Sequence, residues 1–228
     1  MTIERNILIS ILKLTKSGIV ARELISRDAQ VPVQVVDEML KKFLNAGLVQ
    51  RKGNVIEASS DQRIRIVINA IKLGADFQRA CNFLKWDEFE NIAATTLEAN
   101  NFAVKKHLHF SWAGKRWEID VLGFQRPIIV CVDCKHWHHG WARSATLKAV
   151  EAQTERTRAL AEAFPQLGEK VGVVDWKQAV LVPVVLSLTF GPLKFYQNTP
   201  IVPILQFQNF LNEISAHTNW LTHFSVRL

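Results

Sequence analysis

The sequence predicts an α/β protein in which a small helical domain with a hairpin precedes a domain of order αβββαβ built on a mixed central sheet. Three observations predict this class. Apolar residues recur three or four positions apart through residues 3–44, which is typical of helices. After residue 86, a helix is followed by three strand-like runs joined by short turns. A helical crossover of about twenty residues then leads to another strand, so the sheet combines antiparallel and parallel pairs.

Composition excludes two broad classes of protein. The 228 residues are 48% hydrophobic and 21% charged, and no apolar run approaches the ~18 residues of a membrane span. We therefore expect neither a membrane protein nor a disordered chain. The amphipathic N-terminus lacks the features of a signal peptide, and three cysteines are too few and too odd in number for a disulfide framework, which indicates a cytoplasmic protein. The net charge of +7 favours a polyanionic partner.

Residues 1–59 are expected to form the first domain. Ile3, Ile7, Ile11 and Leu14 share one helical face, and Gly18 follows as a stop signal. The remaining elements expected here are a short helix over 20–26, a helix that opens at Pro32 and ends at Gly47, and strands over 48–51 and 54–57 around the turn Lys52-Gly53.

Three helices and a hairpin resemble a winged helix-turn-helix domain. In that family the third helix enters the major groove of DNA and the wing contacts the backbone. The resemblance implies DNA contacts from five residues, which are Gln34, Lys41, Lys42, Arg51 and Lys52. The alternative is a protein-docking module with a solvated polar face, because the charge surplus of this domain is modest.

A helical connector is expected over residues 60–85, and a second domain over 86–228. The capping cluster Ser59-Ser60-Asp61 opens one connector helix that runs to Gly74, and a second short helix covers 75–85. The elements expected in the second domain are a helix from Trp86, strands over 102–110, 115–123 and 128–135, a long helix over 147–164, strands over 179–188 and 201–205, and a final helix over 207–214.

Acidic residues on two neighbouring strands give the clearest chemical signal. Because side chains alternate along a strand, Glu118 and Asp120 are expected on one face of the second strand, and Asp133 and Lys135 on one face of the third. A hairpin that turns at 125–127 would set Asp120 opposite Asp133. Two converging carboxylates repel one another unless a cation lies between them, and such a site suits Mg²⁺.

Three segments, in this order on an αβββ pattern, resemble the PD-(D/E)XK nuclease superfamily. They are Trp86-Asp87-Glu88-Phe89-Glu90, Ala113-Gly114-Lys115-Arg116-Trp117-Glu118-Ile119-Asp120-Val121 and Val132-Asp133-Cys134-Lys135. Within the superfamily, Phe89-Glu90 followed by Leu97 and Phe102 looks most like Mrr-type restriction endonucleases and archaeal Holliday-junction resolvases. The resemblance covers about residues 86–165 and implies a restriction-endonuclease-like fold.

The resemblance also implies a role for each matching residue. Asp120 would be the central metal ligand, Asp133 the second carboxylate, and the carbonyl of Cys134 a further ligand of Mg²⁺ or Mn²⁺. Lys135 would orient or help deprotonate the attacking water and stabilise charge in the transition state. Glu90 would be the outer ligand, although Asp87 and Glu90 also fit a capping pair at the helix start. Ile119 stands where the superfamily's name implies proline.

Other polar residues around this motif have two readings each. Glu118 is either a solvent-facing strand carboxylate or an accessory ligand. Gln153 resembles the glutamine of the Gln-xxx-Tyr motif of RecB-like nucleases, but Thr157 replaces the tyrosine, so a structural hydrogen bond is the alternative. The residues that would form a phosphate-contacting rim, or else only pack and solubilise, are His136, Trp137, His138, His139, Trp141, Arg143 and Lys148.

A zinc site is the alternative to the magnesium site. Cys131, Cys134, His136 and His138 are ligand-type residues at suggestive spacing. Cysteines three apart on an extended strand point to opposite faces, however, so they cannot share one tetrahedral ion without a sharp bend.

The sequence therefore predicts a metal-dependent DNA endonuclease that hydrolyses phosphodiester bonds with a metal-activated water. We expect DNA as partner, no membrane association, and a homodimer because cleavage of two strands favours one. Two alternatives stay open. One is a DNA-binding or recruitment protein in which a nuclease fold no longer cuts, and the other is a nuclease that acts on RNA.

Overall fold

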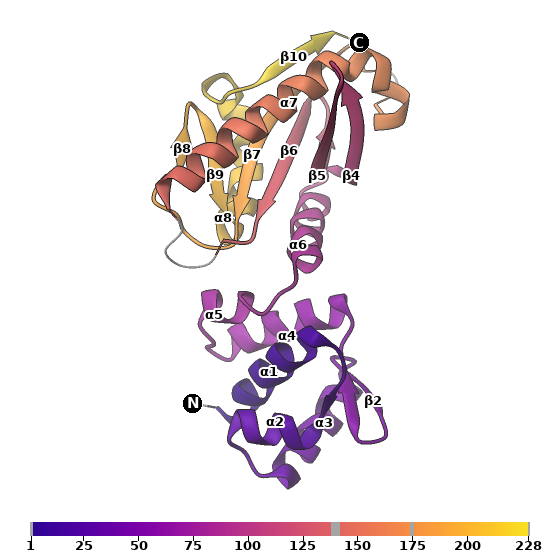
Figure 1. Ribbon diagram of the computed structural model, residues 1–228, viewed down its shortest axis with the longest axis vertical. Coiled ribbons are helices and arrows are strands. Elements are labelled where there is room, and N and C mark those ends of the chain that lie inside the picture. The colour runs from indigo at the N-terminus through magenta and orange to yellow at the C-terminus, as the bar shows by residue number, and fades with distance from the viewer. Residues whose placement is uncertain (1, 138–141, 174–175, 228) are drawn as a thin grey trace. The chain divides into compact units, whose positions relative to one another are not determined.

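The computed structural model describes residues 2–137, 142–173 and 176–227. The chain forms two compact units, Met1–Phe89 and Glu90–Leu228. The elements of both units are labelled in Figure 1. In the described part of the chain, no helix combines the length and the apolar content that a membrane crossing requires.

The first unit has the helices and small sheet expected of a winged helix. Its first elements are α1 (Ile3–Leu14), the 3-10 turn η1 (Thr15–Ser17), β1 (Val20–Ala21), α2 (Arg22–Ala29), α3 (Val33–Asn45), β2 (Gln50–Lys52) and β3 (Val55–Glu57). The strands form a sheet of order β1-β3-β2. The apolar stripe of α3 is buried at Val36, Leu40 and Phe43. The third helix and the hairpin are thus confirmed.

One expected boundary in this unit is wrong. The second helix was expected over 20–26, but Val20 and Ala21 form β1 and pair with Ile56 and Val55 of β3. A strand of two residues has no alternation pattern of its own, and the pairing that defines it comes from residues more than thirty positions away. The helix therefore begins only at Arg22.

Two further helices complete the first unit. α4 (Ser60–Lys72) begins with a capping box, in which Ser59 Oγ accepts the Gln62 N–H and Gln62 Oε1 accepts the Ser59 N–H. α5 (Phe77–Cys81) is capped by Asp76, whose Oδ1 accepts the Arg79 N–H. The expected connector helices over 60–85 are therefore present, and both lie in the first unit.

The second unit is built on one mixed sheet. Its elements are α6 (Trp86–Ala99), which starts in the first unit, β4 (Ala103–Trp112), β5 (Lys115–Gln125), β6 (Ile128–Lys135), α7 (Arg143–Val171), β7 (Gln178–Ser187), β8 (Phe195–Tyr196), β9 (Thr199–Pro203), α8 (Ile204–His217), the 3-10 turn η2 (Thr218–Trp220) and β10 (Phe224–Arg227). The strand order is β4-β5-β6-β7-β9-β8, and β10 pairs with β7.

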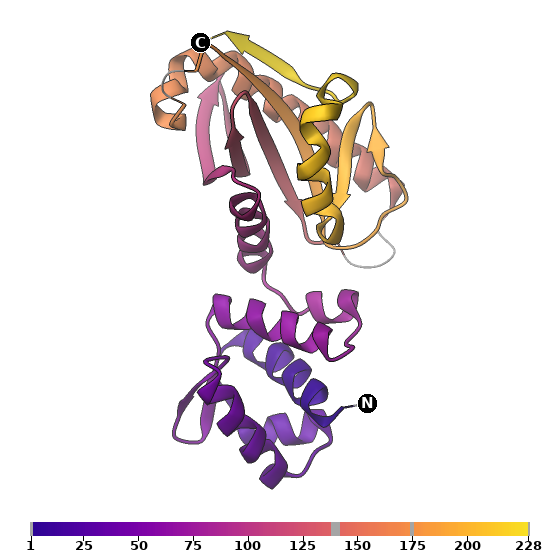
Figure 2. The ribbon, with the colours of Figure 1, turned by 180° about the vertical axis from the view of Figure 1, so that it is seen from behind.

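The expected αβββαβ order and the mixed sheet are confirmed. β4-β5 and β5-β6 are antiparallel hairpins, whereas β6-β7 is parallel and joined by the α7 crossover. α7 crosses one face of the sheet in Figure 1, and α8 covers the opposite face in Figure 2. β8 and β10 were not expected, and α8 is longer at both ends than the helix expected over 207–214.

α6 approaches β5 closely at a glycine. A Cβ atom at Gly123 would lie 2.5 Å from Leu97 Cδ2, so the backbone of β5 and the buried face of α6 leave no room for a side chain there. Leu97 and Phe89 are fully buried. Earlier in the same helix, Glu90 and Asn91 contact His107 and Lys106 in the middle of β4.

Candidate functional site

Asp120 and Asp133 lie on adjacent strands, as the sequence predicts. The β5–β6 pairing runs from Gln125 and Ile128 to Val121 and Val132. Asp120 and Asp133 are the next residues along each strand. Asp120 Oδ2 accepts a hydrogen bond of 2.8 Å from the Cys134 N–H, which ties the Asp120 carboxylate to β6 just where the pairing ends.

The Asp120 carboxylate is held in an unfavourable electrostatic environment. Burial and the negative charges of Asp133 and Glu90 raise its pKa to about 6, although the Cys134 N–H and the charge of Lys135 act in the opposite direction. Each cause that raises this pKa is one that a bound cation would counteract. The electrostatics are those of a site that gains from positive charge.

Asp133 is buried and surrounded by cationic side chains. Lys135 Nζ lies 3.0 Å from Asp133 Oδ1 and 2.8 Å from Oδ2, and Arg156 Nη1 donates to Oδ1 at 2.6 Å. Asp133 Oδ2 is buried and forms an ion pair with the Lys135 ammonium, without a hydrogen bond of regular geometry. A buried carboxylate requires a cationic partner, because desolvation without one is costly. Lys135 and Arg156 are those partners here, and a divalent cation is another partner that such a carboxylate suits.

Gln153 connects α7 to β6 beneath this cluster. Its Nε2 donates to the Cys131 carbonyl at 2.7 Å, and its Oε1 accepts from Arg156 Nη1 at 2.9 Å. Gln153 is completely buried. It makes the structural hydrogen bond that the sequence left as one alternative, and it also aligns the guanidinium of Arg156 with Asp133.

Arg156 is a site residue that the sequence reasoning missed. The sequence indicates Arg156 only through its position, which is three residues after Gln153 and therefore on the same side of a helix. A lone arginine on an amphipathic helix is ordinarily solvated, so this position alone does not separate it from its neighbours. The parallel crossover is what brings it onto the middle strand of the sheet.

Glu90 is buried at the start of the second unit and contacts His107 of β4. His107 Nε2 lies 3.5 Å from Glu90 Oε2, and His107 Nδ1 lies 3.7 Å from Glu118 Oε1. At the start of α6, Glu88 Oε2 accepts the Lys85 N–H, and Asp87 Oδ2 accepts from Ser60 Oγ. Glu88, which the sequence reasoning did not consider, thus supplies one side-chain acceptor at this helix start.

The regular alternation of β5 is interrupted at Asp120. Ile119 and Leu122 both belong to the core cluster that includes Leu160 and Phe164 of α7. Residues three apart on a regular strand face opposite sides, so the strand changes phase between them. The regular alternation that placed Glu118 and Asp120 on one face does not hold here, and Glu118 is half-exposed beside His107 and His109.

The cysteines are poor zinc ligands in this setting. Cys131 and Cys134 are buried and free, and burial raises the pKa of both thiols well above the ordinary value. Metal coordination requires the thiolate, which this environment disfavours. Of the histidines proposed with them, His136 follows the end of β6 and is half-buried, while His138 lies outside the described residues.

The residues expected to contact DNA differ in whether their side chains already form ion pairs within the protein. In the first unit, three basic side chains form ion pairs, which are Lys42 with Glu4 at 2.8 Å, Arg51 with Asp37 at 3.9 Å and Lys52 with Glu57 at 3.1 Å. Gln34 and Lys41 are exposed on α3, as are Arg143 and Lys148 on α7. Trp137 is half-buried, and His139 and Trp141 lie outside the described residues.

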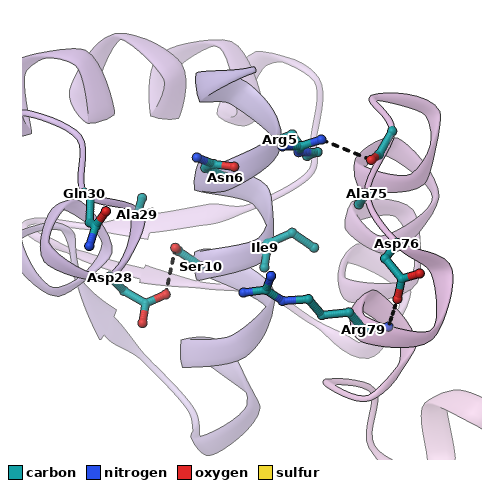
Figure 3. A pocket seen from close by; sticks show the side chains of 11 residues that line it. Arg5, Asn6, Ile9, Ser10, Asp28, Ala29, Gln30, Ala75, Asp76 and Arg79 are labelled. Atoms are coloured by element: carbon teal, nitrogen blue, oxygen red, sulfur yellow. Dashed lines mark hydrogen bonds between the residues drawn. The ribbon is translucent and has the colours of Figure 1, made fainter. Parts of the chain in front are cut away.

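A cavity of about 500 Å³ lies apart from these residues, inside the first unit. Figure 3 shows its lining from α1, the end of α2 and the segment 74–79. Arg5 Nη1 donates to the Gly74 carbonyl, and Asp28 accepts from Ser10 Oγ and Lys13 Nζ. Arg5 and Asp28 are thus each bound to neighbouring groups, and none of the predicted catalytic residues lines the cavity.

The carboxylates of Asp120, Asp133 and Glu90 are ligands of the kind that a hard divalent cation prefers, although they are not arranged around one ion. Within the described ranges, no three His, Cys, Asp or Glu side chains converge as ligands of one ion. The Asp133 carboxylate instead pairs with Lys135 and Arg156. Asp120, Glu90 and Asp133 nevertheless supply carboxylate oxygens, which Mg²⁺ and Mn²⁺ prefer.

The fold and the site define a mixed α/β protein with two carboxylates and a lysine on its central hairpin. No protein-family model matches the chain. It is 30% identical over 131 residues to an uncharacterized protein of Archaeoglobus fulgidus, which corresponds to 58% of this chain and 92% of that protein. The chain belongs to the same family as this uncharacterized archaeal protein.

Three solved structures are similar at low identity. They are AF1548, a protein of unknown function (17% identity, TM-score 0.29, 43% of this chain and 44% of that chain), VC1899 from Vibrio cholerae (10%, 0.42, 95% and 51%) and the restriction endonuclease FokI (12%, 0.32, 94% and 40%). This chain thus spans about half or less of the length of each solved structure.

Proposed function

We propose that this protein is a Mg²⁺- or Mn²⁺-dependent nuclease that hydrolyses phosphodiester bonds of DNA. The observation that carries the proposal is the pair of carboxylates on adjacent strands, Asp120 and Asp133, with the Lys135 ammonium 2.8 Å from Asp133. The proposal agrees with the resemblance to PD-(D/E)XK nucleases and rests on the geometry of this site.

Four groups would hold the cation, namely Asp120, Asp133, Glu90 and the carbonyl of Cys134. When bound, the cation would act as a Lewis acid and supply an activated water. The protein's own contribution is to place Asp120 where burial and the charges of Asp133 and Glu90 act on it, at a cost that shows in the raised pKa of Asp120. The Cys134 N–H fixes one Asp120 oxygen and leaves the other available.

Lys135 and Arg156 have different tasks in this proposal. Arg156 is held by both Gln153 and Asp133, so it orients the Asp133 carboxylate. Lys135 is one quarter exposed and reaches Asp133 with the end of a flexible side chain. Its ammonium can therefore turn to a phosphate and stabilise the negative charge that develops as the phosphorus is attacked.

The remaining parts of the proposal concern organisation and partners. We propose a division into a winged-helix domain (1–59), a helical connector (60–85) and a nuclease-like domain (86–228). DNA would be bound by the exposed residues of α3 and α7, and a homodimer would cut both strands. The cleavage assay described below compares the DNA structures that the protein could cut.

A second candidate function is a DNA-binding protein that does not cut. The observation that favours it is the internal neutralisation of Asp133 by Lys135 and Arg156, which could serve as a purely structural ion-pair cluster. The unfavourable charge of Asp120 argues for the nuclease, since a structural cluster has no need of it.

Cleavage assays with Lys135→Ala separate the two functions. Branched, single-stranded, duplex and modified DNA, and RNA, are incubated with Mg²⁺, Mn²⁺ or EDTA. We expect metal-dependent cleavage that falls by roughly 10² or more in Lys135→Ala, with DNA binding retained, because an electrostatic stabiliser of the transition state is lost. That factor corresponds to about 3 kcal/mol in activation free energy.

The matched control is Lys115→Ala, which removes an exposed lysine at the tip of the β4–β5 hairpin. Its cleavage rate should stay within about twofold of wild type, as for a surface change. Equal non-zero rates for wild type and Lys135→Ala would show that Lys135 has no part in cleavage and overturn its assigned role. A wild type that cleaves none of the substrates would favour the non-catalytic alternative.

A further inference from the structure

We propose that His107, supported by Glu118, is a positioning residue that holds the Glu90 carboxylate at the metal-binding end of the site. This inference rests on the proposed nuclease function. It assigns a role to His107, which the sequence motifs do not include, to Glu118 beside it, and to a backbone distortion in the middle of β4.

His107 has a left-handed backbone inside a strand. Its φ is 51°, a conformation that costs free energy for a residue with a side chain and is uncommon outside turns. The β4–β5 pairing runs in one continuous register from Ala103 and Phe124 to Trp112 and Lys115, and the single step absent from it is His107 opposite Asp120. The distortion is therefore placed directly across from the central carboxylate of the site.

The distortion sends two consecutive side chains to the same helix. Lys106 Nζ donates to Asn91 Oδ1 at 2.6 Å, and His107 Nε2 lies 3.5 Å from Glu90 Oε2. On a regular strand, neighbouring residues point to opposite faces, so only one of the two could reach α6. The left-handed residue is what allows β4 to contact both Glu90 and Asn91.

The imidazole lies between two carboxylates of unequal exposure. Glu90 is buried, with 5% of its side chain exposed, whereas Glu118 on the other side is half-exposed at 50%. A carboxylate on one ring nitrogen fixes the orientation of the ring, so that the other nitrogen is presented to its own partner. Glu118 would thus orient His107, and His107 would orient Glu90.

A surface histidine without a functional role would not explain this geometry. Glycine would adopt the left-handed backbone without strain, and nothing in the pairing of β4 and β5 requires a side chain at this position. His109 provides the comparison, since it is also 3.7 Å from Glu118 but lies in regularly paired strand and has no contact with Glu90 among the described interactions. What distinguishes His107 is its contact with Glu90.

The test measures Mn²⁺ binding by electron paramagnetic resonance together with thermal unfolding, using the full chain. We expect His107→Gly and His107→Ala to weaken Mn²⁺ binding about tenfold or more, the range seen when residues that orient metal ligands are removed. His107→Gly should at the same time unfold at a higher temperature than His107→Ala, because glycine relieves the strain. His107→Gln, which keeps an N–H donor, should bind Mn²⁺ more tightly than either.

The control is His109→Ala, which should leave Mn²⁺ affinity within about twofold of wild type. If His107→Gly and His107→Ala bind Mn²⁺ as wild type does while wild type cleaves DNA, the inference is wrong and the proposed function stands. If wild type neither binds Mn²⁺ nor cleaves, both are wrong. If all His107 variants lose affinity in proportion to a lowered unfolding temperature, His107 is only structural, which also overturns the inference.

Discussion

At the scale of a residue, Asp120 shows how a functional site can lower the stability of the folded protein. Burial and the charges of Asp133 and Glu90 raise its pKa to about 6, so the native state binds its proton more tightly than the unfolded chain does. Between the unfolded and folded pKa values, from about pH 4 to about pH 6, a rise in pH therefore favours unfolding. Above pH 6, the full penalty of the ionised Asp120 is present.

We predict that Asp120→Asn stabilises the metal-free protein at pH 8 and not at pH 4. The expected gain at pH 8 is up to about 3 kcal/mol, which is the pKa shift converted into free energy. Urea unfolding in EDTA at both pH values, on wild type and variant, measures the difference. A variant that is equally destabilised at both pH values would show that the Asp120–Cys134 hydrogen bond outweighs the charge.

The residues of the site differ in how far the sequence reveals them. Asp120 and Asp133 could be placed together because one tight hairpin sets their register, and Lys135 because it follows two residues later on the same strand. His107 could not, since a left-handed residue within a strand has no signature in hydrophobic alternation. Arg156 could not either, because its contact with Asp133 depends on how α7 lies on the sheet.

At the scale of elements, a buried arginine organises the helices of the first unit. Arg63 of α4 is completely buried and donates to the Leu12 carbonyl, Thr15 Oγ1, the Phe83 carbonyl and Glu88 Oε1, all at 2.5 to 2.6 Å. These contacts join α1, the segment after α5 and the first turn of α6. Every donor group of the guanidinium that faces the interior thus has an acceptor.

We predict that Arg63→Ala destabilises the first unit by about 3–5 kcal/mol, because it leaves the buried Glu88 carboxylate without its partner. Hydrogen exchange of the α1 and α4 amides, followed by mass spectrometry, reports on this unit separately from the second. Arg65→Ala is the control, since exposed Arg65 donates only to the Ala46 and Gly47 carbonyls and should cost about 1 kcal/mol or less. Equal protection in both variants would contradict the prediction.

Elements were predictable from the sequence to the extent that their signals are local. α1, α3 and α4 carry apolar periodicity and capping residues, and β6 is a continuous apolar run, so all were found. β1 and β10 are short and pair with strands distant in sequence, so no local pattern records them. β8 pairs with the next strand, β9, but its two residues are too few to show an alternation pattern.

At the scale of the whole molecule, the net charge of +7 and the many internal ion pairs determine how DNA could be bound. A basic residue contributes to binding only if its charge can pair with a phosphate without first leaving a carboxylate. Lys41 and Lys42 are neighbours on α3 and both exposed, but Lys42 is paired with both oxygens of Glu4. The two lysines therefore form a matched pair for testing whether the first unit binds DNA.

We predict that DNA affinity falls steeply with salt and that Lys41→Ala lowers it more than Lys42→Ala does. If Lys41 contacts a phosphate, its loss should reduce the slope of log affinity against log salt by roughly one, whereas the loss of Lys42 mostly frees Glu4. Fluorescence anisotropy of a labelled duplex over a range of salt concentrations measures both slopes.

Affinity that does not change over a several-fold rise in salt would contradict an electrostatic DNA interface. Equal effects of the two variants would instead show that the Lys42–Glu4 pair opens on binding, and parallel slopes with metal-dependent cleavage intact would assign the winged helix to protein docking.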